Sequence, residues 1–254
     1  MSQAAGAKGE PVAVVTGAAG GMGEAISRRL HRDGFRVLVT DLDEAAGARL
    51  AQELSPDGSS CTFHRLDVSR KADFEETLAH LRAGWGEPSV LVNNAALTRA
   101  ADTMTLDADE FLDVLSVNSG SVFWGCQVFG AAMAEAGYGR IVNMASLAGE
   151  NGGTATGAHY ATSKGGIITL TKVFARQLAG SGVTVNAISP GPHDLPVVHL
   201  TVPEDKLAAV VSTIPVGHLG DPAFIADTVS LLVQDNAGFV TGAVWDINGG
   251  LYLR

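Results

Sequence analysis

The sequence has little cysteine, little charge and no long apolar run. Its 254 residues include two cysteines, Cys61 and Cys126, which lie far apart and form no CxxC motif. They are predicted to be free, largely buried thiols of a reducing compartment. No apolar run approaches the ~20 residues that a membrane-spanning helix needs, and residues 1–10 lack the apolar core of a signal peptide. We therefore expect a cytoplasmic protein with no membrane partner.

Positive charge is also scarce. The chain carries 17 Lys and Arg against 27 scattered Asp and Glu, a formal net charge of −10. This balance argues against nucleic acid or an anionic membrane as a partner. The length suits one large domain, which we expect over residues 11–254 behind a flexible tail at residues 1–10. The 31 glycines fit a fold with many tight strand-to-helix turns around a buried sheet.

Short apolar runs alternate with longer segments of helical period. The runs are rich in β-branched residues without polar alternation, as in a parallel sheet covered on both faces. Strands that alternate with helices imply right-handed crossovers, so we predict an α/β fold with one doubly wound parallel sheet of about seven strands and helices on both faces. The expected strands are 12–16, 37–40, 62–66, 90–93, 141–144, 183–188 and 243–247. The expected helices are 22–32, 44–54, 71–82, 109–136, 158–179 and 223–234.

One late segment, residues 191–220, fits neither pattern. It contains four prolines, at positions 192, 196, 203 and 215. A long excursion of this kind in a compact domain is often an active-site lid. An ordinary surface excursion with a short helix near 204–211 is the alternative, and the sequence leaves both open.

A glycine-rich stretch follows the first expected strand and precedes a helix. It reads Thr16-Gly17-Ala18-Ala19-Gly20-Gly21-Met22-Gly23. Glycines permit a tight turn and leave room for a pyrophosphate, while the helix N-terminus offers free N–H groups and the positive end of its dipole. The stretch therefore predicts a dinucleotide site.

An acid at the end of the second expected strand, Asp41, indicates which dinucleotide is bound. A carboxylate at this place accepts hydrogen bonds from the adenosine ribose and repels a 2′-phosphate. The neighbouring Ala18, Ala19 and Gly20 offer no cation to offset that repulsion. The sequence therefore predicts NAD rather than NADP, with a plain turn or N-cap role for Asp41 as the alternative.

Tyr160 and Lys164 are four residues apart in an expected helix. This spacing places both side chains on one helix face. An ammonium near a phenol favours the phenolate, so Lys164 is expected to lower the pKa of Tyr160 towards neutrality. Such a tyrosine can exchange a proton with an alcohol or a carbonyl oxygen. The alternative is a chance pair on a solvated helix face.

Further motifs follow in a fixed order along the chain. They are Asp67-Val68, Asn93-Asn94-Ala95-Ala96, Asn118, Ser146 in a Ser-x-x-Gly, Pro190-Gly191 and Asn248-Gly249-Gly250. Together with the glycine-rich stretch and the Tyr-x3-Lys pair, this order resembles the short-chain dehydrogenase/reductase family, nearly from end to end. The resemblance implies a Rossmann-like fold and an oxidoreductase that moves a hydride between NAD and a secondary alcohol or its ketone. It also implies a homotetramer, and no metal is expected.

The resemblance assigns a role to each matched residue. Tyr160 would be the general acid/base, and Lys164 would lower its pKa and bind the nicotinamide ribose. Ser146 would hold the substrate oxygen, and Asn118 would position a water between Lys164 and solvent. The implied cofactor-binding residues are Gly17, Gly21, Met22, Gly23, Asp41, Leu42, Asp67, Val68, Asn94, Tyr160, Lys164, Pro190 and Gly191. In isolation, Ser146 is equally a strand-end cap and Asn118 a satisfied helix residue.

The sequence departs from the family pattern at three places. Ala96 replaces a usual glycine, which is tolerable only if its φ is not positive. Leu195 stands where relatives often carry a threonine that holds the nicotinamide carboxamide, so only a backbone contact is expected there. Asn248 replaces an aspartate in the closing motif, a mild change.

Substrate contacts are expected from Leu147, His159 and His193, with Glu150 as a further polar candidate. His159 is equally well read as a structural histidine, because helix neighbours point about 100° apart. The mainly apolar surroundings favour a small or medium secondary alcohol. A 3-oxoacyl-carrier-protein reductase, a sugar or polyol dehydrogenase, and a non-catalytic dinucleotide sensor or scaffold are the alternatives. The first is opposed by Asp41 and by the lack of a basic docking patch.

Overall fold

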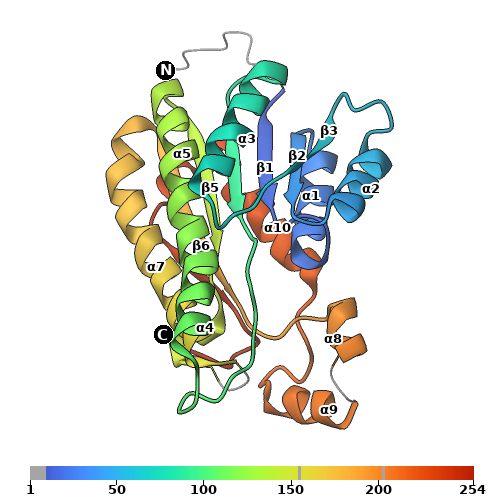
Figure 1. Ribbon diagram of the computed structural model, residues 1–254, viewed down its shortest axis with the longest axis vertical. Helices are drawn as coiled ribbons and strands as arrows, with labels where there is room; N and C mark the ends of the chain where they lie inside the picture. Colours follow the sequence, from blue (N-terminus) through green and yellow to red (C-terminus); the bar gives the residue numbers. More distant parts are fainter. Residues whose placement is uncertain (1–9, 154–155, 202–203) are drawn as a thin grey trace.

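The sheet is the organising element of the chain. The computed structural model describes residues 10–153, 156–201 and 204–254. Within these ranges seven parallel strands form one sheet in the order β3-β2-β1-β4-β5-β6-β7 (Figure 1). The direction in which successive strands are added reverses between β1 and β4. The strands are β1 Val12–Thr16, β2 Arg36–Asp41, β3 Cys61–Arg65, β4 Val90–Asn93, β5 Gly139–Met144, β6 Val183–Pro190 and β7 Val244–Ile247. The predicted Rossmann-like, doubly wound parallel sheet is confirmed.

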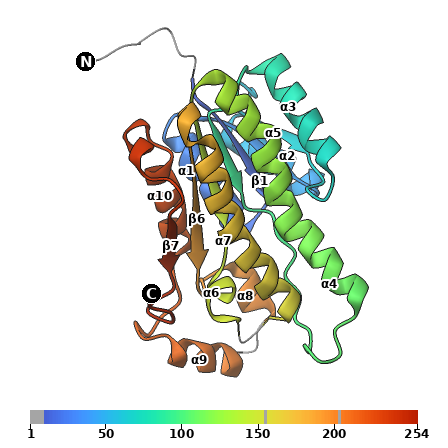
Figure 2. The same ribbon diagram turned by 90° about the vertical axis from the view of Figure 1, so that its left-hand side faces the viewer.

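Helices cover both faces of this sheet (Figure 2). They are α1 Gly21–Arg32, α2 Glu44–Leu54, α3 Lys71–Gly84, α4 Ala108–Leu115, α5 Ser121–Ala136, α6 Leu147–Asn151, α7 Ala158–Leu178, α8 Pro196–Thr201, α9 Glu204–Thr213 and α10 Pro222–Leu232, with short 3-10 turns at Ala179–Ser181 and Asp235–Phe239. Val12 and Val14 of β1 pack with α3, α5 and α7, whereas Ala13 and Val15 pack with α1, α2 and α10. Both faces of the strand are thus buried, which explains its unbroken apolar run.

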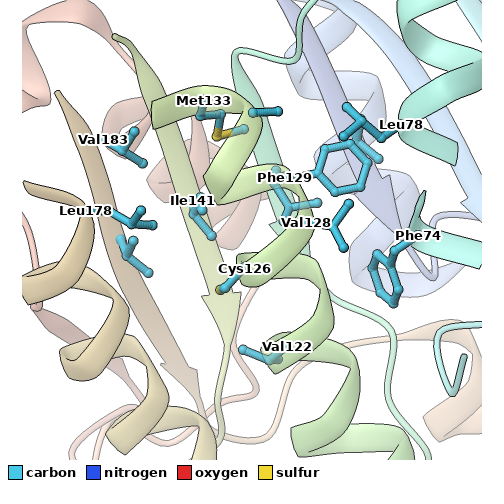
Figure 3. Packing of buried hydrophobic residues seen from close by; sticks show 14 of the residues in the cluster. Phe74, Leu78, Val122, Cys126, Val128, Phe129, Met133, Ile141, Leu178 and Val183 are labelled. Carbon is cyan, nitrogen blue, oxygen red and sulfur yellow. The ribbon is translucent and has the colours of Figure 1, made fainter. Parts of the chain in front are cut away.

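The core beneath α3, α5 and α7 holds the largest buried side chains. Phe74 of α3 and Phe129 of α5 are fully buried there, with Met133 and Ile141 beside them (Figure 3). Cys126 belongs to the same cluster. It and Cys61 are free and buried, as predicted, and burial raises the pKa of each thiol to about 12. None of the described helices is long and apolar enough to cross a membrane.

The expected helix over 109–136 is interrupted. Between α4 and α5 the chain forms a π-helical segment, Ser116–Gly120, which contains Asn118. The Oδ1 atom of Asn118 accepts a hydrogen bond from the N–H of Leu97 (2.7 Å), and its Nδ2 donates to the carbonyl of Leu97 (3.0 Å). The wider turn accompanies this bonding to the loop after β4, and π segments often occur at functional sites. Periodicity missed α6 and α8, because helices this short carry too few residues for a pattern.

The expected lid contains two helices, α8 and α9. The prediction of a short helix near 204–211 is confirmed by α9. The base of the excursion is closed by backbone hydrogen bonds from Asp194 N–H to the Gly220 carbonyl (2.8 Å) and from Gly220 N–H to the Pro192 carbonyl (3.0 Å). Residues 202–203 of this segment, and residues 1–9 of the expected tail, lie outside the described residues.

Candidate active site

The glycine loop between β1 and α1 is packed too closely for side chains. Gly17 has a φ of +62°, and a Cβ on it would lie 2.7 Å from the Cα of Ala95. A Cβ on Gly23 would lie 2.1 Å from the carbonyl oxygen of Gly17. Both positions therefore require glycine. The first approach packs the loop against the chain just after β4, and the second packs the first turn of α1 against the loop.

The outer side of the same loop is open. A Cβ on Gly20 or Gly21 would meet no atom within 4 Å, and α1 begins at Gly21 without a side-chain cap. The first N–H groups of a helix have no intrahelical acceptor. Those of Gly21, Met22 and Gly23 are therefore available to an anionic group. The loop is a cradle of the size and polarity that a phosphate fits.

Asp41 lies at the end of β2, beside this cradle. Its carboxylate accepts hydrogen bonds from the N–H groups of Ala19 (2.9 Å) and Asp43 (3.1 Å). It also lines a cavity of about 600 Å³ that extends from the glycine loop to the loop after β4. The cavity has room for a large part of a dinucleotide. Predicted cofactor residues in its lining are Gly17, Asp41, Leu42, Val68 and Asn94.

Asn94 and Asp67, both predicted cofactor residues, lie close to the ends of β4 and β3. The side-chain Nδ2 of Asn94 donates to the carbonyls of Thr16 (3.0 Å) and Gly17 (2.9 Å), which ties β4 to the glycine loop. The carboxylate of Asp67 accepts from the N–H (3.0 Å) and the hydroxyl (2.7 Å) of Ser69, and these bonds lower its pKa. At Ala96 the backbone is unstrained, because within the described residues only glycines have positive φ. The added methyl group is thus tolerated, as the sequence required.

Lys164 of α7 is almost completely buried. Its ammonium donates to the carbonyl oxygen of Met144, at the end of β5, over 2.7 Å, and the residue is 3% exposed. Burial lowers the pKa of Lys164 to about 8. The ammonium lies 5.6 Å from the centre of the Tyr160 ring. The structure therefore brings the predicted pair together on one helix face.

The pKa of Tyr160 differs from the prediction. Burial is the largest influence and raises it, while hydrogen bonding with the hydroxyls of Ser146 and Thr98 lowers it. The expectation that Lys164 lowers the pKa of Tyr160 towards neutrality was wrong for this structure. Burial disfavours the charged phenolate by more than the hydrogen bonds of Ser146 and Thr98 favour it.

Ser146 has two roles at once. It is the N-cap of α6, where its Oγ accepts from the N–H of Ala148 (3.2 Å). It also interacts with the Tyr160 hydroxyl. The two readings that the sequence left open, strand-end cap and catalytic partner, are therefore compatible.

The side chain of Asn118 is fully buried, and both its oxygen and its nitrogen are hydrogen-bonded. Besides its two bonds to Leu97, its Nδ2 donates to the hydroxyl of Ser163 (3.0 Å). That hydroxyl donates to the carbonyl of Tyr160 (2.7 Å). Ser163 thus connects the π segment to the first turn of α7. Sequence analysis missed Ser163, although it lies within the Tyr-x3-Lys stretch.

A smaller cavity, of about 220 Å³, lies in front of Tyr160. The Gly191 N–H donates to the carbonyl of Ile247 (2.8 Å), which fixes the chain where the lid begins. The lining includes Ser146, Leu147, Asn151, Tyr160, Pro190 and Gly191. Leu147 is therefore placed where a substrate contact is expected.

The two histidines and Glu150 lie elsewhere. His159 is fully buried, with its Nε2 3.6 Å from a carboxylate oxygen of Glu110. His193 is buried at the base of the lid, where its Nδ1 bonds the carbonyl of Gly191 (2.8 Å), and it lines a different cavity of about 270 Å³. Glu150 pairs with Arg254. None of the three lines the cavity in front of Tyr160, so the reading of His159 as a structural residue fits the geometry.

The comparisons with known proteins agree with this geometry. A family model described as Enoyl-(Acyl carrier protein) reductase matches residues 17–252. The chain is 35% identical over 252 residues to a (3R)-3-hydroxyacyl-CoA dehydrogenase of Canis lupus familiaris, covering 95% of this chain and 96% of the relative. It is also 35% identical over 242 residues to a 3-oxoacyl-(acyl-carrier-protein) reductase of Pseudomonas aeruginosa, covering 95% and 97%. The chain belongs to the short-chain dehydrogenase/reductase family.

As a member of the short-chain dehydrogenase/reductase family, the protein is an oxidoreductase that acts on CH–OH groups with a nicotinamide dinucleotide. The cradle at Gly17–Gly23 and the cavity beside Asp41 fit such a cofactor in shape and polarity. Family membership does not determine whether the cofactor is NAD or NADP, nor which alcohol is the substrate.

Proposed function

We propose that the protein interconverts a secondary alcohol and its ketone with NAD, and that Tyr160 transfers the proton. The observation that carries this proposal is the position of the Tyr160 hydroxyl. It interacts with Ser146 and Thr98, lines the cavity beside Pro190 and Gly191, and lies one helical turn from the buried ammonium of Lys164. A general acid/base needs this combination of access to substrate and a nearby group that influences its pKa.

When bound, the nicotinamide ring accepts or gives the hydride, and in its oxidised form it carries a positive charge. The chain's own residues hold and orient it. The N–H groups of the glycine loop meet the pyrophosphate, and Asp41 meets the adenosine ribose. The complete proposed set is Gly17, Gly21, Met22, Gly23, Asp41, Leu42, Asp67, Val68, Asn94, Tyr160, Lys164, Pro190 and Gly191.

Three side chains would handle the proton. In oxidation, the alcohol hydroxyl gives its proton to the phenolate oxygen of Tyr160, while the Ser146 hydroxyl donates a hydrogen bond to the same substrate oxygen. Lys164 stabilises the phenolate by its charge and is held for this by the Met144 carbonyl. Because both N–H donors of the Asn118 side chain are used by Leu97 and Ser163, its part in proton exit would rest on an oxygen atom as acceptor. Its Oδ1 accepts one bond, from the N–H of Leu97, and its main-chain carbonyl accepts one from Ser121 Oγ (3.0 Å).

The preference for NAD rests on charge at the adenosine ribose. Asp41 lies at the mouth of the large cavity and the glycine loop carries no cation. Arg65 is opposite Asp41 in the β2–β3 register, but its guanidinium pairs with Glu44 (3.5 Å) and Asp73 (3.9 Å). A 2′-phosphate would therefore meet a carboxylate and an arginine that is already paired.

Cofactor choice is tested by the ratio of kcat/KM values for NAD and NADP. We expect NAD to be favoured by about 100-fold or more, since a repulsive unit charge near a phosphate costs several kcal/mol. The Asp41→Ala variant should reduce this ratio by at least roughly 10-fold. A wild-type ratio that favours NADP would refute the assignment.

The reaction is tested by NADH formation with a panel of secondary alcohols. Wild type and Tyr160→Phe are measured side by side, with NAD affinity determined for both. Turnover that the variant loses while it still binds NAD would support the proposal. Near-normal turnover in Tyr160→Phe would contradict the proposed role of this residue, and binding of NAD without turnover across the panel would favour a dinucleotide sensor.

A second candidate substrate class is a 3-hydroxyacyl thioester. Two relatives at 35% identity, a (3R)-3-hydroxyacyl-CoA dehydrogenase and a 3-oxoacyl-(acyl-carrier-protein) reductase, favour it. The cavity of about 220 Å³ has room for the reacting end of a short acyl chain, with the carrier arm outside. A short 3-hydroxyacyl-CoA belongs in the same panel. A kcat/KM far above that of simple alcohols would identify this class.

The proposed assembly is a cytoplasmic homotetramer. Large apolar side chains are exposed on the helices and the last strand region that would form its interfaces. Leu112 of α4 is 61% exposed and Phe239, before β7, is fully exposed. Light scattering tests this proposal directly, and a clean monomer would remove it.

A further inference from the structure

We propose that Arg254 is a positioning residue: by pairing with Glu150 and Asp246 it holds helix α6, and with it Ser146, against the catalytic helix α7. The inference rests on the proposed function of Ser146 and Tyr160. It concerns residues far from one another in sequence, since Glu150 precedes Arg254 by 104 positions.

The guanidinium of Arg254 joins two poorly exposed carboxylates. Its Nε donates to Oδ2 of Asp246 in β7 over 2.6 Å, and its Nη2 donates to Oε1 of Glu150. The Glu150 side chain is 9% exposed and that of Asp246 is 19% exposed. A carboxylate so far removed from water needs a cationic partner. Removing the arginine would leave Glu150 with an unpaired charge at the edge of the site.

The chain after β7 is folded back so that Arg254 can reach these acids. Asn248 forms the turn: its Oδ1 accepts from the N–H of Gly250 (3.0 Å), and its Nδ2 donates to the carbonyl of Tyr252 (3.2 Å). An aspartate in this place could accept the first bond but could not donate the second. Asn248, which replaces the aspartate of the family's Asp-Gly-Gly, therefore has a structural role. Its amide closes the turn that places Arg254 beside Glu150 and Asp246.

Helix α6 connects this ion pair to the reacting groups. A Cβ on Gly149 would lie 2.6 Å from both the carbonyl carbon of Lys164 and the nitrogen of Gly165, so the two helices touch backbone to backbone. Ser146 caps the start of the same helix. A helix of five residues is unstable alone. It is held by the Ser146 cap, by the Gly149 contact and, on its outer side, by Glu150 and Arg254.

Amide hydrogen exchange of residues 147–151 tests the proposal without any substrate. In Arg254→Ala, exchange of α6 should accelerate by about 10-fold or more, because a buried carboxylate that loses its cationic partner destabilises the helix that carries it. The matched control is Arg82→Ala. Arg82 also joins two carboxylates, Glu87 (2.8 Å) and Glu135 (3.6 Å), but in a different part of the fold. Its loss should leave α6 unchanged.

Kinetics provide the second readout. Misplacement of Ser146 should lower kcat by roughly 10- to 100-fold while the Kd for NAD stays the same. The acid limb of the pH–rate profile should also move to higher pH, since contact with Ser146 lowers the pKa of Tyr160. A general loss of stability would not move this limb. Arg254→Lys should recover part of both effects.

These experiments distinguish a failure of the positioning role of Arg254 from a failure of the proposed function. Unchanged exchange in α6 of Arg254→Ala would overturn the positioning role, whatever the enzyme's activity. Absent turnover in wild type, or turnover retained by Tyr160→Phe, would overturn the proposed function alone. If Arg254→Ala does not fold, Asn248→Asp and Arg254→Lys take its place. Both should accelerate exchange in α6 to a smaller extent, and wild-type exchange in both would overturn the proposal.

Discussion

The buried charge of Lys164 is expected to destabilise the folded protein, so Lys164→Met should be more stable than wild type. The pKa of Lys164 falls from its ordinary 10.5 to about 8 because burial disfavours the charged form. At about 1.4 kcal/mol per pH unit, a charged Lys164 lowers the free energy of unfolding by about 3 kcal/mol at neutral pH. The buried lysine thus lowers stability, but it also places a positive charge near Tyr160, where we propose that it acts in catalysis.

Methionine has a similar length and no charge. The substitution removes the hydrogen bond to the Met144 carbonyl (2.7 Å), and an acceptor left unpaired costs about 1–3 kcal/mol. The net expectation is a gain of between about zero and 2 kcal/mol, centred on about 1 kcal/mol, in the free energy of unfolding near pH 7. Turnover should be nearly abolished in the same variant.

The pH dependence follows from the direction of the shift. Below about pH 8 Lys164 is charged in both folded and unfolded chains, so the full cost is present. Between about 8 and 10.5 the unfolded chain binds more protons than the folded one, and stability rises with pH. The stability of wild type should therefore rise to that of Lys164→Met and then exceed it across this range, because the neutral lysine keeps the hydrogen bond to Met144 that the variant lacks.

Urea unfolding at equal protein concentrations, from about pH 7 to about pH 10, measures both effects. Lys172→Met is the control, since Lys172 is an exposed lysine on the same helix. It should change neither the stability nor its pH dependence. A Lys164→Met variant less stable than wild type at neutral pH, or a difference from wild type that does not vary with pH, would refute the reasoning.

Three further predictions concern packing. Gly23→Ala should abolish NAD binding in calorimetry or prevent folding, because its methyl group would lie 2.1 Å from the Gly17 carbonyl oxygen. Cys61 and Cys126 should resist a thiol reagent in the native protein at pH 8 and react on unfolding, since burial raises both pKa values to about 12; rapid native labelling would contradict their burial. Ser163→Ala should lower the free energy of unfolding by about 1–3 kcal/mol, because it removes the acceptor of a buried amide, and should reduce kcat more than NAD affinity.

The fold was predictable because its signals are local. The central strands, such as β1 and β4, are buried apolar runs, and each long helix repeats its apolar positions over several turns, so the order of elements follows without tertiary information. The π segment at Ser116–Gly120 could not be found this way. Its wider turn accompanies the bonds of Asn118 to Leu97, a contact 21 positions away that periodicity does not record.

The site was predictable in its residue types but not in its energetics. The spacing of Tyr160 and Lys164 correctly placed them together, yet the pKa of Tyr160 is raised in the structure because burial is decided by packing from several elements. Glu150 illustrates the same limit. It was expected near the substrate and instead pairs with Arg254, a partner that only the folded chain supplies.

The π segment also fixes the length of the chain between α4 and α5. A π turn contains one more residue than the α turn it replaces. Deletion of a single residue from 116–120 would convert the wider turn into an α turn and leave α4 and α5 in phase, because the extra residue is contained within the turn. The side chains left in this stretch would take new positions around the turn, and the bonds of Asn118 to Leu97 and Ser163 would be lost. In this stretch the number of residues is therefore as strictly constrained as their identity, and insertions or deletions are expected in the surface loops instead.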